Sequence, residues 1–455
     1  MESTRVGAGA ANERDRPELA MQMLTEGDVE YLGFDNLAER TLAFAHLRKG
    51  EDPRSGENPL VRERMGPMLA PALEKGVKMA GNFGAANPER AAEILHEEAI
   101  ARGIERFRVG LVLGDDVTEL VQSGELPLQF WETGGGVDSL PGPVISANVY
   151  LGAEPILTAL QKDADVVVTG RAADFSPYIA MLAHRFGWSL DDWSRIAGAA
   201  AVGHMLECGR YVTGGAHADP FYGKETPDIE NLALPLAEAF EDGHAIISKP
   251  PNSGGMISVA TCTEQILHEV HDVSRYLSPD LVLDVRDLTF EQVGPDRVEM
   301  KGAKGSPPTD TYKAVCGVQA GWIAEGEITF PGPGCVRKAE ITAEMVKSRL
   351  RRAGVELEEL RVDMIGLNSI FGPQTIAPSE EPPEVRLRLA GRSRDKAAAA
   401  QLEIECEDMW FGPIGGGGVR TVLRPVLAMY STLIPRDKVP ITVRVTERED
   451  QEMTL

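Results

Sequence analysis

The chain has few basic residues relative to acidic ones, and it lacks long apolar runs. Its 455 residues include 46 Lys and Arg against 70 Asp and Glu, which gives a net charge of −24. A surface of that sign repels nucleic acid and anionic membranes, so neither is expected as a partner. No run of eighteen apolar residues occurs, and the first residues lack the basic and apolar segments of a signal peptide. The sequence therefore predicts a cytoplasmic protein without a membrane span.

Recognisable cofactor and metal motifs are also missing. The five cysteines are widely spaced and form no C-x-x-C pair, which indicates reduced thiols rather than a zinc or dithiol site. The loop GNFGAAN at 81–87 does not satisfy G-x-G-x-x-G, and the glycine runs at 133–136 and 415–418 have no Lys-Ser/Thr behind them. No cofactor is predicted. A divalent metal stays open, because His204 and Glu207 are spaced to share a helix face.

Short apolar runs alternate with helical patterns over the first 187 residues, which is typical of βαβ units. Strands are predicted around Val6 and at 31–34, 77–80, 109–113, 144–150 and 166–168. Helices are predicted at 17–26, 37–48, 88–102, 156–162 and 191–209. Together these elements predict an α/β domain over residues 1–280 with a mostly parallel sheet, either doubly wound or barrel-like.

The pattern changes after Asp284, where apolar and polar residues alternate as in antiparallel strands. The alternation covers 285–300 and 313–330, and it is followed by predicted helices at 336–353 and 394–407 and strands at 362–367 and 439–445. PSEEPP at 378–383 predicts an exposed loop, because proline is not tolerated in a helix interior. Residues 281–455 are therefore predicted to form an α+β domain.

Small and polar residues follow the predicted parallel strands. The clearest case is ADVVVTGRAADFSPY at 164–178, where an apolar strand ends in Thr169 and is followed by Arg171 and Asp174. Ligands of α/β sheets bind beyond the carboxyl ends of the strands, although Asp and Asn also cap helices and form turns. The candidate site residues at these ends are Asn12, Asn82, Gly84, Asp115, Asp116, Asn148, Thr169, Arg171 and Asp174.

Later loops add further candidates. Glu207 ends a predicted helix, and His217 lies in the Gly-Gly loop VTGGAHADP. The stretch IISKPPNSGGM at 246–256 places Lys249 before two prolines and offers Ser253, Gly254 and Gly255 as donors to a carboxylate or an oxyanion.

These motifs together resemble the acyclic terpene utilisation (AtuA-like) family over about residues 6–444. The resemblance rests on FDNLAERT (34–41), GAANP (84–88), GDDV (114–117), TGRAAD (169–174), GHMLECG (203–209), VTGGAHADP (212–220), KPPNSGGM (249–256), EQILHEVHD (264–272) and GEITFPGPG (326–334). It implies a cytoplasmic catabolic role with branched or terpenoid acids, alongside acyl-CoA enzymes. Longer members carry a further small ferredoxin-like domain at the C-terminus, which this chain is expected to lack and which a separate small subunit could supply.

The favoured function is a lyase or hydratase acting beside a carboxylate or thioester, in a homo-oligomer. Such chemistry needs a base for the α-proton, an acid for the leaving oxygen and donors for the developing anion. Asp115 or Asp174 is the candidate base and His217 or Glu207 the candidate acid. Arg171, Lys249 and the amides of 253–255 form the candidate anion clamp.

Two alternatives stay open at the sequence level. The first is a hydrolase of an acyl or lactone bond with Ser253 or Cys208 as nucleophile, although neither residue lies in G-x-S-x-G. The second is a non-catalytic subunit that binds an acid and presents it to a partner.

Overall fold

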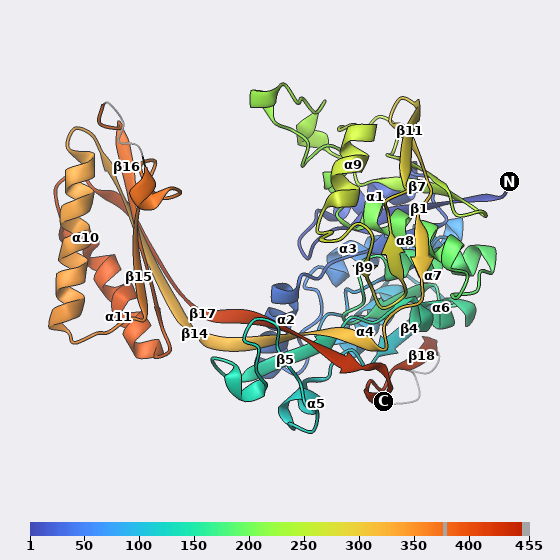
Figure 1. The fold of residues 1–455 in the computed structure, drawn as a ribbon, viewed down its shortest axis with the longest axis horizontal. Coiled ribbons are helices and arrows are strands. Elements are labelled where there is room, and N and C mark those ends of the chain that lie inside the picture. The colour runs from blue at the N-terminus through green and yellow to red at the C-terminus, as the bar shows by residue number, and fades with distance from the viewer. Residues whose placement is uncertain (376–379, 448–455) are drawn as a thin grey trace. The chain divides into compact units, whose positions relative to one another are not determined.

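The chain forms two compact units (Figure 1), and the computed structural model describes residues 1–375 and 380–447. The larger unit comprises Met1–Ser139, Ile145–Gly317 and Met429–Leu455, and the smaller comprises Leu140–Val144 and Val318–Ala428. The division therefore differs from the predicted boundary between residues 280 and 281. Residues 281–317 belong to the larger unit, together with residues near the end of the chain.

A ten-stranded sheet runs through the larger unit. Its order is β11 (Thr289–Gly294), β12 (Arg297–Lys301), β8 (Ala245–Ser248), β7 (Leu236–Phe240), β1 (Ser3–Ala10), β2 (Tyr31–Phe34), β3 (Lys78–Gly81), β6 (Val166–Thr169), β4 (Arg108–Leu113) and β18 (Thr442–Glu447). The five central strands, from β1 to β4 in this order, pair in parallel. The remaining strands extend this core on both sides by antiparallel pairing.

The prediction of a mostly parallel sheet is therefore not confirmed, because the parallel core makes up only the centre of a mixed sheet. Short turns join β7 to β8 and β11 to β12, and such turns can connect only antiparallel neighbours. The barrel-like alternative does not describe this sheet either, since β11 and β18 lie at its two ends. The strand β5 (Val144–Val149), predicted as one of six alike, lies outside the sheet and pairs with β14 (Thr311–Pro331).

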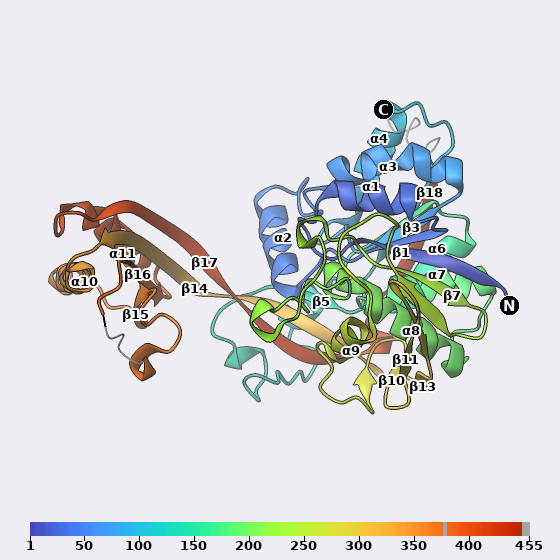
Figure 2. The ribbon, with the colours of Figure 1, turned by 90° about the horizontal axis from the view of Figure 1, so that it is seen from above.

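Helices cover both faces of the parallel core, as the βαβ pattern predicts. In Figure 2, α1 (Pro17–Glu26), α3 (Val61–Lys75) and α4 (Pro88–Ala101) lie on one side of the central strands. The opposite side carries α6 (Ala153–Gln161), α7 (Ser176–Phe186) and α8 (Trp193–Glu207). Each predicted helix of this part is present within a few residues of its predicted bounds. The helix α3 was not predicted, because Pro67 and Pro71 interrupt its sequence pattern.

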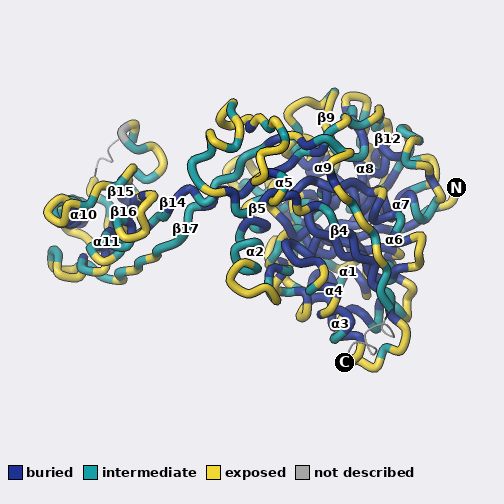
Figure 3. The backbone as a smooth tube through the Cα atoms, turned by 90° about the horizontal axis from the view of Figure 1, so that it is seen from below, coloured by how far each residue is buried: buried dark blue, intermediate teal, exposed yellow. Residues whose placement is uncertain are grey.

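Shorter elements complete the larger unit. The helices are α2 (Glu39–Glu51), α5 (Thr118–Gln122) and α9 (Val259–Leu267), and a small sheet is formed by β13 (Lys304–Ser306), β10 (Val282–Asp284) and β9 (Tyr276–Leu277). Figure 3 shows buried residues concentrated in the strands and helices of this unit. Among the described residues, no helix is long and apolar enough to cross a membrane.

The smaller unit consists of an antiparallel sheet and two helices, which agrees with the predicted α+β class. Its sheet has the order β15 (Glu359–Ile365), β16 (Glu384–Ser393), β14 and β17 (Gly417–Pro435). The helices α10 (Cys335–Arg352) and α11 (Lys396–Glu407) pack on β16, and residues such as Val346, Leu387 and Leu402 are fully buried in the resulting core. Residues 378 and 379 of the predicted loop at 378–383 lie outside the described residues.

Candidate active site at the strand ends

Four adjacent parallel strands, β2, β3, β6 and β4, bring polar side chains to one edge of the sheet. Asn82, just after β3, donates from Nδ2 to Asp35 Oδ1 at 2.6 Å. The backbone N–H of Arg171, just after β6, donates to Asp115 Oδ2 at 2.7 Å. These bonds join the ends of neighbouring strands, so the side chains that follow them are held at fixed positions.

Arg171 is the buried cation of this edge, with only 3% of its side chain exposed. Its Nη1 donates to the carbonyl oxygen of Leu37 at 2.6 Å, and its Nη2 lies 2.7 Å from Asp174 Oδ1. Its Cζ lies 4.0 Å from the ring centroid of Tyr150, a cation–π contact. Burial disfavours the charged form, but the neighbouring acidic groups, above all Asp174, raise the pKa of Arg171 well above its ordinary value. The guanidinium is therefore permanently charged.

Three carboxylates converge beside this guanidinium. Asp35 follows β2, Asp174 lies in the loop between β6 and α7, and Glu207 ends α8. One oxygen from each lies within 4.8 Å of the others. We call these three residues the acidic cluster. Asp35 and Glu207 are buried, whereas 28% of the Asp174 side chain is exposed.

Burial and mutual repulsion weaken the acidity of the cluster. Burial is the main cause that raises the pKa of Asp35 well above its ordinary value, and the charges of Asp174 and Glu207 add to it. The same two effects, burial and then the charge of Glu207, outweigh the opposing charge of Arg171 and raise the pKa of Asp174 to about 6. Arg171 thus compensates only part of the negative charge gathered here.

The third carboxylate, Glu207, is contacted by a thiol and an imidazole. The thiol of Cys208 donates to Glu207 Oε1 at 3.1 Å, and His204 Nδ1 lies 3.3 Å from the same oxygen. Burial, followed by the charge of Glu207, raises the pKa of the Cys208 thiol, so this group stays protonated. The His204 ring is buried, and neither of its nitrogens has a hydrogen-bond partner among the described residues.

A second network surrounds Asp115. Besides the Arg171 amide, Asp115 Oδ2 accepts a bond from Asn148 Nδ2 at 2.9 Å, and Asn148 Oδ1 lies 2.9 Å from His46 Nε2. Burial raises the pKa of Asp115 to about 6, although both hydrogen bonds favour the ionised form. Asp115 therefore fixes the start of the loop that carries Arg171 and Asp174.

The substitution Asp115→Asn is expected to make stability less dependent on pH. Because the folded-state pKa of about 6 exceeds the ordinary value of 3.8, the folded chain binds more protons, and this carboxyl lowers stability as pH rises from about 4 to about 6. The asparagine oxygen can accept both bonds without a charge, so the variant should gain about 2 kcal/mol relative to the parent above pH 6. Urea unfolding at about pH 4.5 and about pH 7.5 measures this gain. If the variant and the parent differed in free energy of unfolding by the same amount at both pH values, the prediction would be wrong.

The comparisons with known proteins point to one family. Residues 4–445 match the family described as "Acyclic terpene utilisation family protein AtuA". The chain belongs to this family. A comparison with curated proteins gives no match. Membership implies a catabolic role in acyclic terpene utilisation, as the sequence motifs predicted.

The residues at this edge come from four of the motifs that resemble the AtuA family. FDNLAERT supplies Asp35, GDDV supplies Asp115, TGRAAD supplies Arg171 and Asp174, and GHMLECG supplies Glu207. The motifs lie far apart in the sequence, yet the fold of this AtuA-family chain brings them together at the ends of β2, β4, β6 and α8. We therefore regard this edge as the candidate active site.

Several predicted site residues of the later loops are engaged elsewhere. His217 Nδ1 lies 2.9 Å from Glu264 Oε2, and Lys249 Nζ donates to the Ser253 carbonyl at 2.7 Å. The hydroxyl of Ser253 donates to the Pro250 carbonyl at 2.6 Å. The amides of Gly254 and Gly255 donate to the Asn231 and Pro227 carbonyls at 3.0 and 2.8 Å. In this structure these donors of the predicted anion clamp are thus engaged by backbone carbonyls.

Other predicted residues act in turns near the edge. Asn12 Oδ1 accepts the Arg14 amide at 2.9 Å, and Asp116 Oδ1 accepts the Thr118 amide at 3.0 Å, just where α5 begins. The amide of Gly84 donates to the Thr169 carbonyl at 3.0 Å, which ties the β3 loop to the end of β6. Turn formation accounts for Asn12 and Asp116 without a ligand.

Three residues of this edge, Asp35, Glu39 and Tyr150, were not among the predicted site residues. Asp35 directly follows a predicted strand, which was the available signal. Glu39 lies in the motif FDNLAERT and Tyr150 ends a predicted strand, and the two are joined by a bond from the Tyr150 hydroxyl to Glu39 Oε1. Burial would raise the pKa of Glu39, but the charge of Arg171 and the Tyr150 bond outweigh it and lower the pKa to about 2. Glu39 is therefore a further ionised partner of Arg171.

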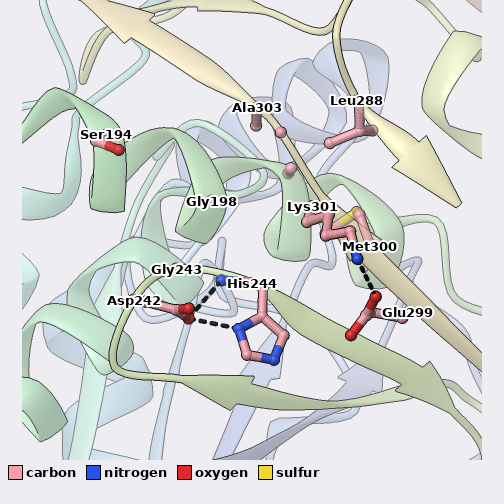
Figure 4. A pocket seen from close by; sticks show the side chains of 12 residues that line it. Ser194, Gly198, Asp242, Gly243, His244, Leu288, Glu299, Met300, Lys301 and Ala303 are labelled. Carbon is pink, nitrogen blue, oxygen red and sulfur yellow. Dashed lines mark hydrogen bonds and ion pairs between the residues drawn. The ribbon is translucent and has the colours of Figure 1, made fainter.

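Cavities among the described residues of the larger unit include a small and a larger one. One of about 10 Å³, bounded partly by Glu39, Tyr150 and Arg171, is barely large enough for one water. The other, of about 390 Å³, is formed near α8, β8 and β12, and none of the acidic cluster lines it. Figure 4 shows the two acid–base pairs on its wall, Asp242 with His244 and Glu299 with Lys301. Its charged groups are already paired, so we do not assign the candidate active site to it.

Proposed function

We propose that this AtuA-family chain is a catabolic lyase or hydratase acting on a branched or terpenoid carboxylate, or on its acyl-CoA thioester. The reaction adds or removes water, or cleaves a carbon–carbon bond, next to the carboxylate or thioester. The observation that carries the proposal is the convergence of the acidic cluster and Arg171 at the carboxyl ends of parallel strands. Strand ends of this kind are the usual ligand-binding edge of α/β sheets.

Asp174 is the candidate proton acceptor. It is the cluster member with a partly exposed side chain, so a substrate can reach it, and Arg171 fixes its Oδ1. In a dehydration, its carboxylate takes the α-proton, the electron pair forms the carbon–carbon double bond, and the β-hydroxyl leaves. Hydration runs through the same steps in reverse.

The leaving oxygen must gain a positive partner, which is either a proton or a cation. Asp35 and Glu207 have oxygens within 4.8 Å of an Asp174 oxygen, so they are the groups that would hold this partner. Both terminal nitrogens of Arg171 are engaged, Nη1 by the Leu37 carbonyl and Nη2 by Asp174, and we therefore give this residue the role of positioning Asp174.

The hydrolase alternative receives less support from the geometry. A nucleophilic cysteine must ionise, whereas burial raises the pKa of the Cys208 thiol. A nucleophilic serine must donate to a base, whereas the Ser253 hydroxyl donates to a backbone carbonyl.

The substitution Asp174→Asn is expected to abolish turnover while a substrate still binds. A panel of di- and tricarboxylates and branched acyl-CoAs, screened by thermal shift, identifies the ligand first, because a ligand at a hundredfold its Kd stabilises by about 2.7 kcal/mol. Loss of general-base catalysis should then lower kcat by about 100-fold or more, with KM little changed. Water addition or loss is followed by mass spectrometry.

The matched control is Asp138→Asn, which removes an exposed carboxylate from the same unit and should leave kcat unchanged. An Asp174→Asn enzyme with parental kcat would overturn the assignment. If every bound acid stays unconverted, also after addition of a small ferredoxin-like subunit, the chain is instead an acid-binding component.

A further inference from the structure

The three oxygens of the acidic cluster are spaced for one bound ion. Each of Asp35, Asp174 and Glu207 offers one carboxylate oxygen, and these oxygens lie within 4.8 Å of one another. At a metal–oxygen distance of about 2.1 Å, opposite ligands of an octahedral ion lie roughly 4.2 Å apart, and at about 2.4 Å they lie roughly 4.8 Å apart. Small side-chain movements therefore suffice to bring all three oxygens to a single cation.

The charge around the cluster also favours a bound cation. Arg171 is the only guanidinium paired with the cluster among the described residues, and it also faces the ionised Glu39. The other ionisable groups around the cluster are acidic or weakly basic: Glu269 adds negative charge beside Asp174, the Cys208 thiol donates to Glu207, and the His204 imidazole lies against the same carboxylate. Carboxylates that are buried without compensation cost several kcal/mol each. A divalent cation supplies the missing charge.

His204 gives a second, independent observation. Its side chain is only 2% exposed, and its Nδ1 points at Glu207 Oε1 from 3.3 Å. Neither ring nitrogen has a hydrogen-bond partner among the described residues. Buried polar groups are nearly always satisfied, and carboxylates that bind metals are themselves hydrogen-bonded by groups behind them. Glu207 needs to shift only slightly toward an ion-binding position for this imidazole to become its donor.

We propose that Asp35, Asp174 and Glu207 bind a hard divalent cation of the Mg²⁺, Mn²⁺ or Ca²⁺ class, with His204 orienting Glu207. The donor set consists of three carboxylate oxygens, which are the ligands that these hard cations prefer. Asp174 binds through one oxygen and keeps the other for the proposed proton transfer. The cation is then the positive partner of the leaving oxygen, a role that rests on the proposed function, whereas binding itself does not.

Binding is tested on the full-length chain after EDTA treatment and dialysis, without any substrate. Titration with MnCl₂, followed by the electron paramagnetic resonance signal of free Mn²⁺, should show one site per chain, and competition with MgCl₂ and CaCl₂ ranks the cations. Asp35→Asn and Glu207→Gln should weaken Mn²⁺ binding by about 100-fold or more, and His204→Phe by about 10- to 100-fold. Asp116→Asn keeps an oxygen that can accept the Thr118 amide and is the matched control, with parental affinity expected.

Thermal unfolding distinguishes loss of metal binding from loss of folding in each variant. Without metal, Asp35→Asn and Glu207→Gln should unfold no earlier than the parent, because each removes one of the repelling charges. MgCl₂ or CaCl₂ should raise the Tm of the parent and of Asp116→Asn only. Absence of Mn²⁺ binding to the parent, or equal binding by Asp35→Asn and Glu207→Gln, would overturn the proposal and leave protons to neutralise the cluster. A parent that binds Mn²⁺ but converts no acid would keep the metal site and refute only the proposed reaction.

Discussion

The substitution Arg171→Ala is expected to destabilise the chain by about 3 to 5 kcal/mol near neutral pH and to abolish activity. Arg171 is 3% exposed and pairs with Asp174 while its charge also favours the ionised form of Glu39. Removing one partner of a buried ion pair leaves the other charge uncompensated, and this penalty is far larger than the loss of a surface pair. Equilibrium unfolding in urea measures the effect.

The pH dependence of that loss distinguishes lost charge from lost packing. Without Arg171, the carboxyls of Asp35 and Asp174 bind protons more readily, so acid relieves the repulsion. The difference between parent and variant should shrink from about pH 8 to about pH 5. Arg171→Lys retains a charge but loses the planar contact with Tyr150, and we expect a smaller cost of about 1 to 2 kcal/mol. If Arg171→Ala and Arg171→Lys were equally unstable at both pH values, packing rather than charge would explain the effect.

The central fold could be predicted because its signals are local. Apolar runs such as Val166–Val168 have no polar alternation, which is what a strand covered on both faces requires, and all three residues are fully buried. Helices such as α4 carry their own start signals, and Asn87 does accept a bond from the Arg90 amide. These signals depend on neighbours in sequence, so no knowledge of tertiary structure is needed to interpret them.

The mixed character of the sheet could not be predicted in the same way. The strand β18 comes from residues 442–447, yet it pairs with β4 at residues 108–113. Such a pairing leaves no signal in either segment alone, because any exposed strand edge offers the same backbone groups. The compact units likewise do not follow one boundary in the sequence, since β14 and β17 each contain residues of both units.

The structure brings together the predicted site residues that directly follow strands, and it engages those of the later loops elsewhere. Arg171, Asp174 and Asp115 follow β6 and β4, so their common edge could be predicted from topology alone. Lys249 and His217 have equally suggestive sequence patterns, but their polar atoms are used by Ser253 and Glu264. Only the tertiary structure shows which polar atoms already have hydrogen-bond partners within the protein. A sequence pattern cannot distinguish such atoms from those that are free to bind a ligand.

The AtuA-family motif TGRAAD contains residues that follow from local sequence signals and a residue that is explained only by a tertiary contact. Thr169 ends β6, and Asp174 belongs to the acidic cluster and is paired with Arg171. Gly170 lies against Asp115. A Cβ atom on Gly170 would lie 2.3 Å from both carboxylate oxygens of Asp115. The glycine is thus required by the close approach of two strand ends, independently of any ligand.

We therefore expect Gly170→Ala to cost about 3 kcal/mol of stability and most of the activity. The Asp115 carboxylate is held by the Arg171 amide and Asn148, so it can move away from a new methyl group only by breaking those bonds. Each lost bond to a buried charged group costs about 1.5 to 3 kcal/mol, and the loop that positions Arg171 and Asp174 would shift as well. Urea unfolding and kcat measure the two effects.

A double-substitution cycle tests whether the clash is the cause. In an Asp115→Ala background the carboxylate is gone, so adding Gly170→Ala should cost at least about 1 kcal/mol less than it does in the parent. A coupling of that sign assigns the requirement for glycine to its contact with Asp115. Additive costs would mean that alanine is excluded by the backbone at this position, and that the strand ends of β4 and β6 are not mechanically linked through these two residues.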